Sequence, residues 1–443
     1  MKKFLAYIPL FLLISGVLIA EESSDWKFNG QIQYRTEADG TDFNNKTYMP
    51  ISTSMRTRLN ISKMYKGALF MGQLSDSRIM GDGGGTLAES GNLDIHQAYV
   101  KLSSLFGTAF DLQVGRFEMN YGTERFIGPV GWHYIGRTFD GARLTLNINK
   151  DATIDLFSTV ERESASYKGN PNSSFVPSEV PTNKTLHGLW GQFKLSDAHK
   201  LDLFAYLEGN RTTLIDDFSR TTLGGSYWGT FDKIKIIAEA AYQLGSSTKL
   251  NEETNVSVDQ DIAAYTASLI AKYMYKDGSV GIAADIMSGT DPNDLTNTDN
   301  NAYATSFGTN HKFYGYMDYF ISVDKNTSNK GLNDFYLMWK HNLSKKFLVG
   351  LNAHYFMTNV AYEVNEFDSD GNKVLNQDGT ESMITEASTL GQEFDLTLKY
   401  KFNPSTTLTW GNSLFIAGDV MINKYNGRQD AAFWSYLMIT ANF

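Results

Sequence analysis

The sequence predicts an all-β fold: a transmembrane antiparallel up-and-down β-barrel of about 18 strands, with long extracellular loops and short periplasmic turns. Three observations predict it. Apolar and polar residues alternate with a period of two, the patterned segments run for about ten to twelve residues, and the connections between them alternate in length. Such segments exceed the five to six residues usual in soluble sheets and suit a tilted strand that crosses a bilayer. An even strand number is expected for a bacterial barrel with both termini in the periplasm.

The composition of the 443 residues agrees with this fold. The chain has 28 Phe, 24 Tyr, 7 Trp and 38 Gly but only 8 Pro and no Cys, which is typical of many strands and turns rather than of a disulfide scaffold. The absence of Cys also excludes a lipoprotein anchor and thiol chemistry. A formal net charge of -10 argues against nucleic acid as a partner, because binding phosphates requires a basic surface.

The N-terminus has the order of a secretory signal peptide. Lys2 and Lys3 precede an apolar run from Phe4 to Ile19, and Ala20 comes before an acidic stretch. The alternative is a membrane anchor, but the run is at the short end for a spanning helix and no positive cluster follows it. We therefore predict a signal peptide at residues 1–20 and a single barrel domain at residues 21–443.

The two-residue period runs from the start of the predicted barrel to its end. In residues 26–37 the apolar Trp26, Phe28, Ile32 and Tyr34 share one face, and polar residues occupy the other. Residues 51–62, 201–210 and 234–243 repeat the pattern. The eighteen predicted strands begin near Trp26, Ile51, Lys66, Leu93, Ala109, Thr138, Ala152, Thr185, Lys200, Arg220, Lys233, Ile262, Ser279, Gly331, Lys346, Gly391, Thr406 and Ala431.

The connections and the last strand complete the barrel pattern. Short polar links at 195–200, 275–279 and 403–406 suit periplasmic turns, whereas the long polar stretches 168–184 and 288–301 suit extracellular loops. The chain ends in an alternating strand with Phe443 as its last residue. A terminal Phe of this kind resembles the signal by which outer-membrane barrels are recognised, so we expect assembly machinery to bind it.

Arginine is concentrated in the first third of the chain, where seven of the twelve arginines fall between residues 56 and 143. By parity Arg56, Arg58, Arg137 and Arg143 face the lumen. Arg116 shares its parity with apolar neighbours and needs a β-bulge to turn inward. A guanidinium on the lipid face costs about 2–4 kcal/mol at the midplane, which favours lumenal or loop positions.

Two interpretations of these arginines stay open. They form a basic lining that binds carboxylate or phosphate groups in transit, or they pair with nearby acids and brace the barrel wall. The acids in reach by sequence are Asp76, Asp94, Glu118, Glu124 and Asp140. The residues predicted to line the pore or contact the solute are Arg56, Arg58, Arg78, Arg116, Glu124, Arg125, Arg137, Asp140 and Arg143.

Several motifs, in this order, resemble the alginate-export outer-membrane porins over most of the mature chain. They are DSR (76–78), DIHQAYV (94–100), the block from Gly115 to Gly141 that ends in GRTFDG, HKFYGYMDYF (311–320) and LGQEFDL (390–396). The resemblance implies an eighteen-stranded barrel whose electropositive lumen passes a linear polyuronate outward through an arginine-rich constriction. It also implies lining roles for Arg116, Arg125, Arg137 and Arg143, with Asp140 and Glu124 as selectivity partners. The chain departs from the family at Phe117, where Gly-Arg-Gln is usual, and has few arginines in its second half.

The segment from His311 to Phe320 is too aromatic for a simple loop and too short for another strand pair. We expect it to fold into the lumen, either as part of the transport path or as a structural plug.

Catalytic and metal-binding motifs find little support. The seven His form no HExxH, no GxSxG precedes a helix, and the DGGG at 82–85 lacks the following GK[ST] of a phosphate loop. A barrel-embedded lipase would need a Ser and a His brought together on the wall. The acidic stretches 291–300 and 368–372 have loosely calcium-like spacing but lack the closing Glu of an EF-hand, which favours solvated turns.

We therefore expect a bacterial outer-membrane channel, not an enzyme and without a cofactor, that is surrounded by outer-membrane lipid and passes an anionic polysaccharide or small polar solutes. The alternatives are a general diffusion porin for small hydrophilic solutes and a plugged barrel with a structural or adhesive role.

Overall fold

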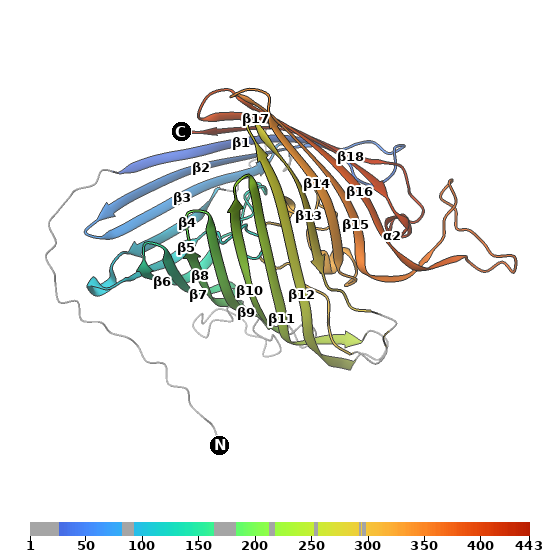
Figure 1. Ribbon diagram of the computed structural model, residues 1–443, viewed down its shortest axis with the longest axis horizontal. Coiled ribbons are helices and arrows are strands. Elements are labelled where there is room, and N and C mark those ends of the chain that lie inside the picture. The colour runs from blue at the N-terminus through green and yellow to red at the C-terminus, as the bar shows by residue number, and fades with distance from the viewer. Residues whose placement is uncertain are drawn as a thin grey trace, which may run out of the picture.

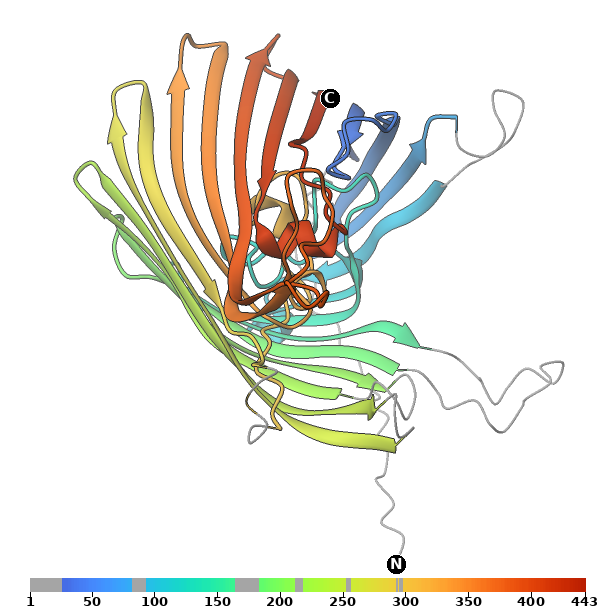
Figure 2. The same ribbon diagram turned by 90° about the vertical axis from the view of Figure 1, so that its right-hand side faces the viewer.

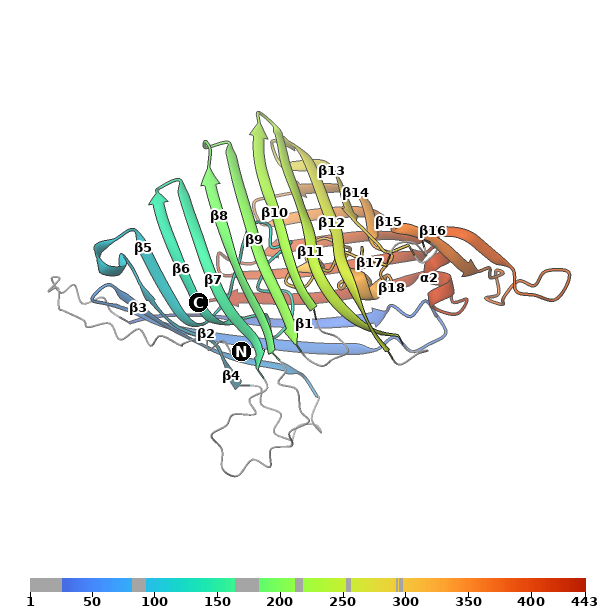
Figure 3. The same cartoon turned by 90° about the horizontal axis from the view of Figure 1, so that it is seen from below.

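The computed structural model describes residues 26–81, 93–163, 183–211, 218–251, 256–291, 294 and 298–443. Its eighteen strands form one antiparallel sheet in which β1 pairs with both β2 and β18, so the sheet closes into a barrel (Figures 1 and 3). The strands are β1 (Lys27–Gly40), β2 (Ile51–Tyr65), β3 (Ala68–Ile79), β4 (Leu93–Leu102), β5 (Phe110–Phe117), β6 (Phe139–Asn149), β7 (Ala152–Glu163), β8 (Asn183–Lys194), β9 (His199–Arg211), β10 (Phe218–Phe231), β11 (Ile234–Asn251), β12 (Val256–Tyr275), β13 (Gly278–Met287), β14 (Leu332–Asn342), β15 (Phe347–Asn365), β16 (Met383–Lys401), β17 (Thr406–Ala417) and β18 (Ala432–Asn442).

The predicted strand positions agree closely with this barrel. Sixteen of the eighteen strands begin within two residues of the predicted starts. The predicted starts of the other two strands are wrong by more than two residues. β12 begins at Val256 rather than near Ile262, and β16 begins at Met383 rather than near Gly391. Both extensions are rich in polar residues, so they lack the apolar alternation of a strand in lipid.

The alternation of each strand separates an outward face from the lumen. On β1 the outward Phe28, Ile32 and Tyr34 are exposed, whereas Gln33 and Arg35 are buried inside. On β18 Phe433 and Leu437 point outward, and Trp434 and Tyr436 point inward. This is the arrangement expected of a barrel whose outer surface contacts lipid.

The two ends of the barrel differ in the length of their connections. Every connection at one end is short, as at residues 66–67, 232–233 and 276–277, and the chain termini of the barrel lie at this end. The opposite end carries the long connections, such as 366–382, which projects beyond β15 and β16 (Figure 1). The short turns therefore mark the periplasmic side.

Two long connections fold into the lumen instead of projecting away from it (Figure 2). The inner loop, residues 118–138, joins β5 to β6, and the inner segment, residues 302–331, precedes β14. They pair through a parallel bridge between Ile127 and Phe307. The inner segment contains the short helices η2 (Asn310–Lys312) and α1 (Val323–Asn326). Large barrels are commonly filled in this way.

The main hydrophobic cluster therefore lies inside the barrel, between the inner loop, the inner segment and the wall. It includes Phe117, Ile127, Trp190, Phe320 and Phe356, all 0% exposed. A last helix, α2 (Asp419–Lys424), packs against the extracellular parts of β15 and β16 and adds Val420 and Met421 to the cluster.

In the described part of the chain, no helix has the length and apolar character needed to cross a membrane. The predicted signal peptide at residues 1–20 lies outside the described residues, as do most of the predicted loop at 168–184 and the DGGG stretch.

Candidate functional site in the barrel lumen

Arg56 and Arg58, on β2, point into the lumen and hold the inner loop. Arg56 donates to the carbonyl oxygens of Gly131 (3.1 Å) and His133 (2.9 Å), and Arg58 donates to that of Ile135 (2.8 Å). Arg58 also pairs with Glu118 at 3.1 Å. A loop whose carbonyls are met by guanidinium donors keeps its backbone satisfied inside the barrel. These two arginines therefore carry structural contacts as well as charge.

Arg125, on the inner loop, lies inside the barrel in a fully buried ion-pair network. It lies 2.9 Å from Glu239 on β11 and 3.0 Å from Asp285 on β13, and its guanidinium stacks over the Phe313 ring at 4.0 Å. Burial opposes its charge, yet the carboxylates of Asp285 and Glu239 raise the pKa of Arg125 well above its usual value. Arg125 therefore stays charged and ties the inner loop to the wall and to the inner segment.

Arg137 and Glu124 join the inner loop to the inner segment. Arg137 donates to the carbonyl oxygen of Phe307 and to that of Gly308, the latter at 3.2 Å. Burial lowers the pKa of Arg137. Glu124 pairs with Lys312 at 2.5 Å. Both predicted residues thus lie inside the barrel, where they connect two parts of the protein.

Arg143, on β6, also faces the lumen. It donates to Gln113 at 2.7 Å, lies 3.8 Å from Asp155 and stands over the Phe117 ring at 5.5 Å. Phe117, the departure from the family pattern, is thus a fully buried residue between wall and inner loop.

The structure contradicts the lumenal placement of Arg78, Arg116 and Asp140. Arg116 keeps the outward parity of Val114 because β5 has no bulge, and it donates to outward-facing Asp140 at 2.7 Å. Arg78 has the outward parity of Leu74 and pairs with Asp76. Arg78, Arg116 and Asp140 each lie within two residues of the extracellular end of their strand. There the free-energy cost of a lipid-facing charge is about 0–1 kcal/mol, compared with about 2–4 kcal/mol at the bilayer midplane.

The segment from His311 to Phe320 folds into the lumen, as predicted. His311 stacks on Trp132 of the inner loop with 4.1 Å between ring centroids. The Glu393 carboxylate of β16 accepts the backbone N–H groups of Tyr316 (2.6 Å) and Met317 (2.9 Å). Gly315 allows this approach, since its φ is +80° and a Cβ there would clash with Glu393.

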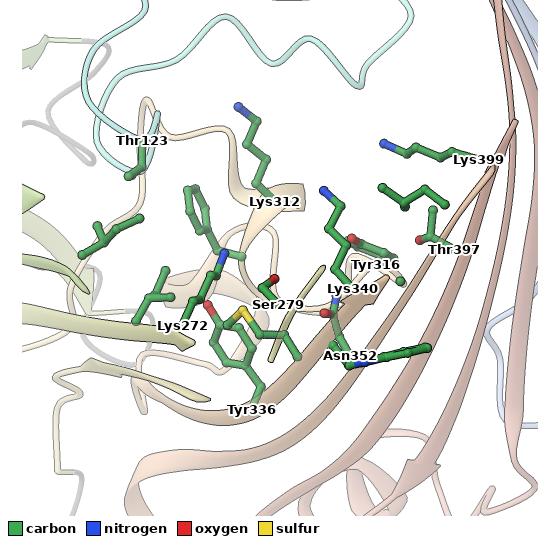
Figure 4. Close-up of a pocket in the computed structure, with 17 residues that line it drawn as sticks. Thr123, Lys272, Ser279, Lys312, Tyr316, Tyr336, Lys340, Asn352, Thr397 and Lys399 are labelled. Atoms are coloured by element: carbon green, nitrogen blue, oxygen red, sulfur yellow. The ribbon is translucent and has the colours of Figure 1, made fainter. Parts of the chain in front are cut away.

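Sequence reasoning missed a group of lumenal lysines in the second half of the barrel. Lys272 (β12), Lys340 (β14) and Lys399 (β16) lie near the periplasmic strand ends and, with Lys312, line a cavity of about 390 Å³ (Figure 4). In the described part of the chain, none of the three strand lysines forms an ion pair, and the charges acting on Lys272 are those of Lys340 and Lys235. Their alternation parity was the available signal, but the prediction counted arginines alone.

The structure also brings a Ser and a His together on the wall. Ser158 Oγ lies 2.9 Å from His187 Nδ1, on the outward face of β7 and β8. Among the residues that the structure describes, no acidic side chain contacts His187 to orient it, as a hydrolytic triad requires.

The predicted solvated turn at 368–372 is confirmed. Asp368 accepts the backbone N–H groups of Asp370 and Asn372, both at 2.9 Å. Over the described ranges, no group of three or more His, Asp or Glu is arranged to hold a metal ion. Most of the 291–300 stretch lies outside these ranges.

Comparison with known proteins places this barrel in a family. The profile of the family described as Alginate export matches residues 27–434, nearly the whole chain. The chain belongs to the alginate export family. This alginate export family member is thus a porin channel of the bacterial outer membrane and not an enzyme. No curated protein matches its sequence.

Solved structures agree on the fold of this alginate export family member. Acinetobacter baumannii OccAB4 has a TM-score of 0.58 at 10% identity, with 95% of this chain and 99% of that chain covered. Pseudomonas aeruginosa OccK8 (OprE) has a TM-score of 0.56 at 12% identity, covering 95% and 98%. The outer membrane protein OprD from Pseudomonas aeruginosa has a TM-score of 0.54 at 13% identity, covering 94% and 93%. At these identities the likeness concerns the fold.

Proposed function

We propose that this channel passes anionic or polar solutes and that Lys272, Lys340 and Lys399 form the surface that selects anions. The observation that supports this proposal is that these three lumenal lysines have no carboxylate partner in the described residues. A lumenal charge without a protein partner attracts the oppositely charged solute, because field lines are focused in a pore with low-dielectric walls.

The arginines have a different part in this proposal. Arg58, Arg125 and Arg143 lie beside carboxylates, and Arg56 and Arg137 donate to backbone carbonyls. The predicted bracing interpretation therefore has support for all five. We infer that they shape the path and add to its positive potential, and that the lysines make the direct contact with the solute.

The partners follow from the same proposal. The solute is an anionic polysaccharide such as a polyuronate, as the family description suggests, or a small polar anion. Outer-membrane lipid covers the outward face, which exposes residues such as Phe28, Leu203 and Leu337. Phe443 is 65% exposed at the periplasmic end and is accessible to assembly machinery.

The test is the reversal potential of the refolded chain in a planar bilayer across a salt gradient. The wild type is expected to prefer anions, and Lys340→Gln with Lys399→Gln to move the reversal potential toward the cation side. Lys345→Gln, in the exposed turn between β14 and β15, is the matched control and leaves the potential unchanged. An unchanged potential in the double variant would refute the selecting role, and a silent bilayer would favour a plugged structural barrel.

A further inference from the structure

On β11, β12 and β14 the lumenal face is built in layers along the barrel axis. Lysines stand nearest the periplasm, and the next inward-facing residues, two positions away, are apolar. Moving away from the periplasm, the next lumenal residue after Lys272 is Ile270, and the one after Lys340 is Met338. On β11, Ile237 comes next after Lys235 in the same direction. The layer beyond contains the buried carboxylates of Glu239, Asp285 and Asp334. Because a strand alternates with a period of two, this layering is set directly by the sequence.

The middle layer is apolar and lies apart from the main hydrophobic cluster, which the inner loop and the inner segment cover. Ile270, Ala283 and Tyr336 form a separate hydrophobic cluster, with Ile237 and Met338 packed against it. Lumenal faces of barrels are ordinarily polar, since they contact water or polar plug residues. An apolar patch that faces a cavity costs free energy unless something apolar covers it.

The cavity that opens on this patch has cations on its other side. Its volume of about 390 Å³ lies in the range of small-ligand sites. Ile237, Ile270 and Met338 line one part of it, and Figure 4 shows Lys312, Lys340 and Lys399 directed into the same open space. Lys312 is neutralised by Glu124, so the strand lysines supply the free charge. The acidic layer beyond favours an anion at the lysines rather than deeper in the lumen.

We propose that this cavity binds a small organic carboxylate with an apolar body, its carboxylate on Lys340 and Lys399 and its body on Ile270 and Met338. The inference rests on the proposed function and names its solute class. A simple inorganic anion leaves the apolar layer uncovered. A polyhydroxylated uronate in the same place turns hydroxyl groups toward Ile237, Ile270 and Met338, which offer no hydrogen bonds, whereas Ser279, Asn352 and Thr397 line other parts of the cavity. An amphipathic anion matches both layers.

The experiment compares benzoate and glucuronate, two monocarboxylates of equal charge, as blockers of the chloride current. Added on either side of the bilayer, benzoate is expected to block at a concentration about tenfold below that of glucuronate, which corresponds to about 1.4 kcal/mol. Ile270→Thr with Met338→Gln is expected to remove most of this advantage and to leave the reversal potential unchanged. Met338→Leu keeps the apolar layer and retains the benzoate block.

The outcomes separate this inference from the proposed function. Equal block by benzoate and glucuronate, or a benzoate block that survives the polar double variant, overturns the inference while anion preference stands. An unselective wild-type pore overturns the proposed function itself. Benzoate block that falls in the polar double variant and persists in Met338→Leu supports the inference.

Discussion

Arg125 shows how one residue secures the interior of the barrel. Its guanidinium is 2% exposed, and Glu239 and Asp285, each 1% exposed, lie on different strands. A buried pair is weak evidence for net stability, but removing one partner leaves the others charged and unpaired. The same side chain stacks on Phe313, so it links the inner loop, the wall and the inner segment.

We expect Arg125→Met to lower the free energy of unfolding by about 3–5 kcal/mol, because two buried carboxylates lose their cation. Chemical unfolding in detergent micelles measures the change. The control is Arg428→Met, whose exposed pair with Asp42 at 3.7 Å is worth about 0–1 kcal/mol. A loss as small as that of the control would show that the carboxylates find other partners.

Glu118 predicts a pH dependence of the inner loop. Burial opposes its ionisation, but hydrogen bonds and charge from His96 and Arg58 outweigh burial and lower the pKa of Glu118. Its contribution to stability is therefore complete above the usual carboxyl pKa, roughly 4.3, and is lost as the pH falls through the lowered pKa. Unfolding measured from pH 7 downward should show this loss in the wild type. In Glu118→Gln this acid-dependent step is absent, and a step that persists would assign it to another carboxylate.

At the scale of elements, alternation predicted most of the barrel and little of its interior. Strand starts such as Ile51 and Thr406 coincide with the observed ones because lipid imposes a strict period. The extracellular parts of β12 and β16 were missed, since strands above the bilayer need no apolar face. Arg78 and Arg116 were misplaced because the cost of an outward charge was taken at the midplane. The contacts of the inner loop with the inner segment join residues more than 150 positions apart, and local patterns do not encode such pairs.

Gly30 lies at the seam where β1 pairs with β18. Its backbone N–H donates to the Phe443 carbonyl at 2.9 Å, and a Cβ at Gly30 would clash with the Arg58 carbonyl oxygen of β2 and with the Phe443 ring. We expect Gly30→Ala to destabilise the closed barrel by about 1–3 kcal/mol, the usual cost of overpacking. Heat-modifiable mobility on gels during refolding measures closure. Gly72→Ala is the matched control, because the nearest atom to its Cβ would be 4.0 Å away, and equal refolding of the two variants would contradict the prediction.

At the scale of the whole molecule, the charged residues differ in their partners along the barrel axis. Outward pairs such as Arg116 with Asp140 lie at the extracellular end of β3 to β6, and arginines inside the barrel hold the inner loop. Near the periplasmic end lie the lysines that form no ion pair with any described residue. A net charge of -10 therefore coexists with a group of lumenal lysines near the periplasmic end. In the proposed function, the position of each charge along the axis, rather than the total, governs what the channel admits.

The inner segment is the largest obstruction in the lumen, and its ends permit a direct test. Asn301 and Asn329 both contact Thr290, whose Oγ accepts the N–H of Asn301 at 2.9 Å and whose N–H donates to the Asn329 carbonyl at 2.7 Å. Residues 302–328 can therefore be replaced by two glycines without stretching the chain. Single-channel conductance is expected to rise several-fold, because ion flow increases with the open cross-section. The barrel itself should persist, since β13 and β14 pair along ten residues without this segment. A conductance equal to that of the wild type would mean that ions already bypass the inner segment, and the lysine cavity would then lie beside the main path rather than on it.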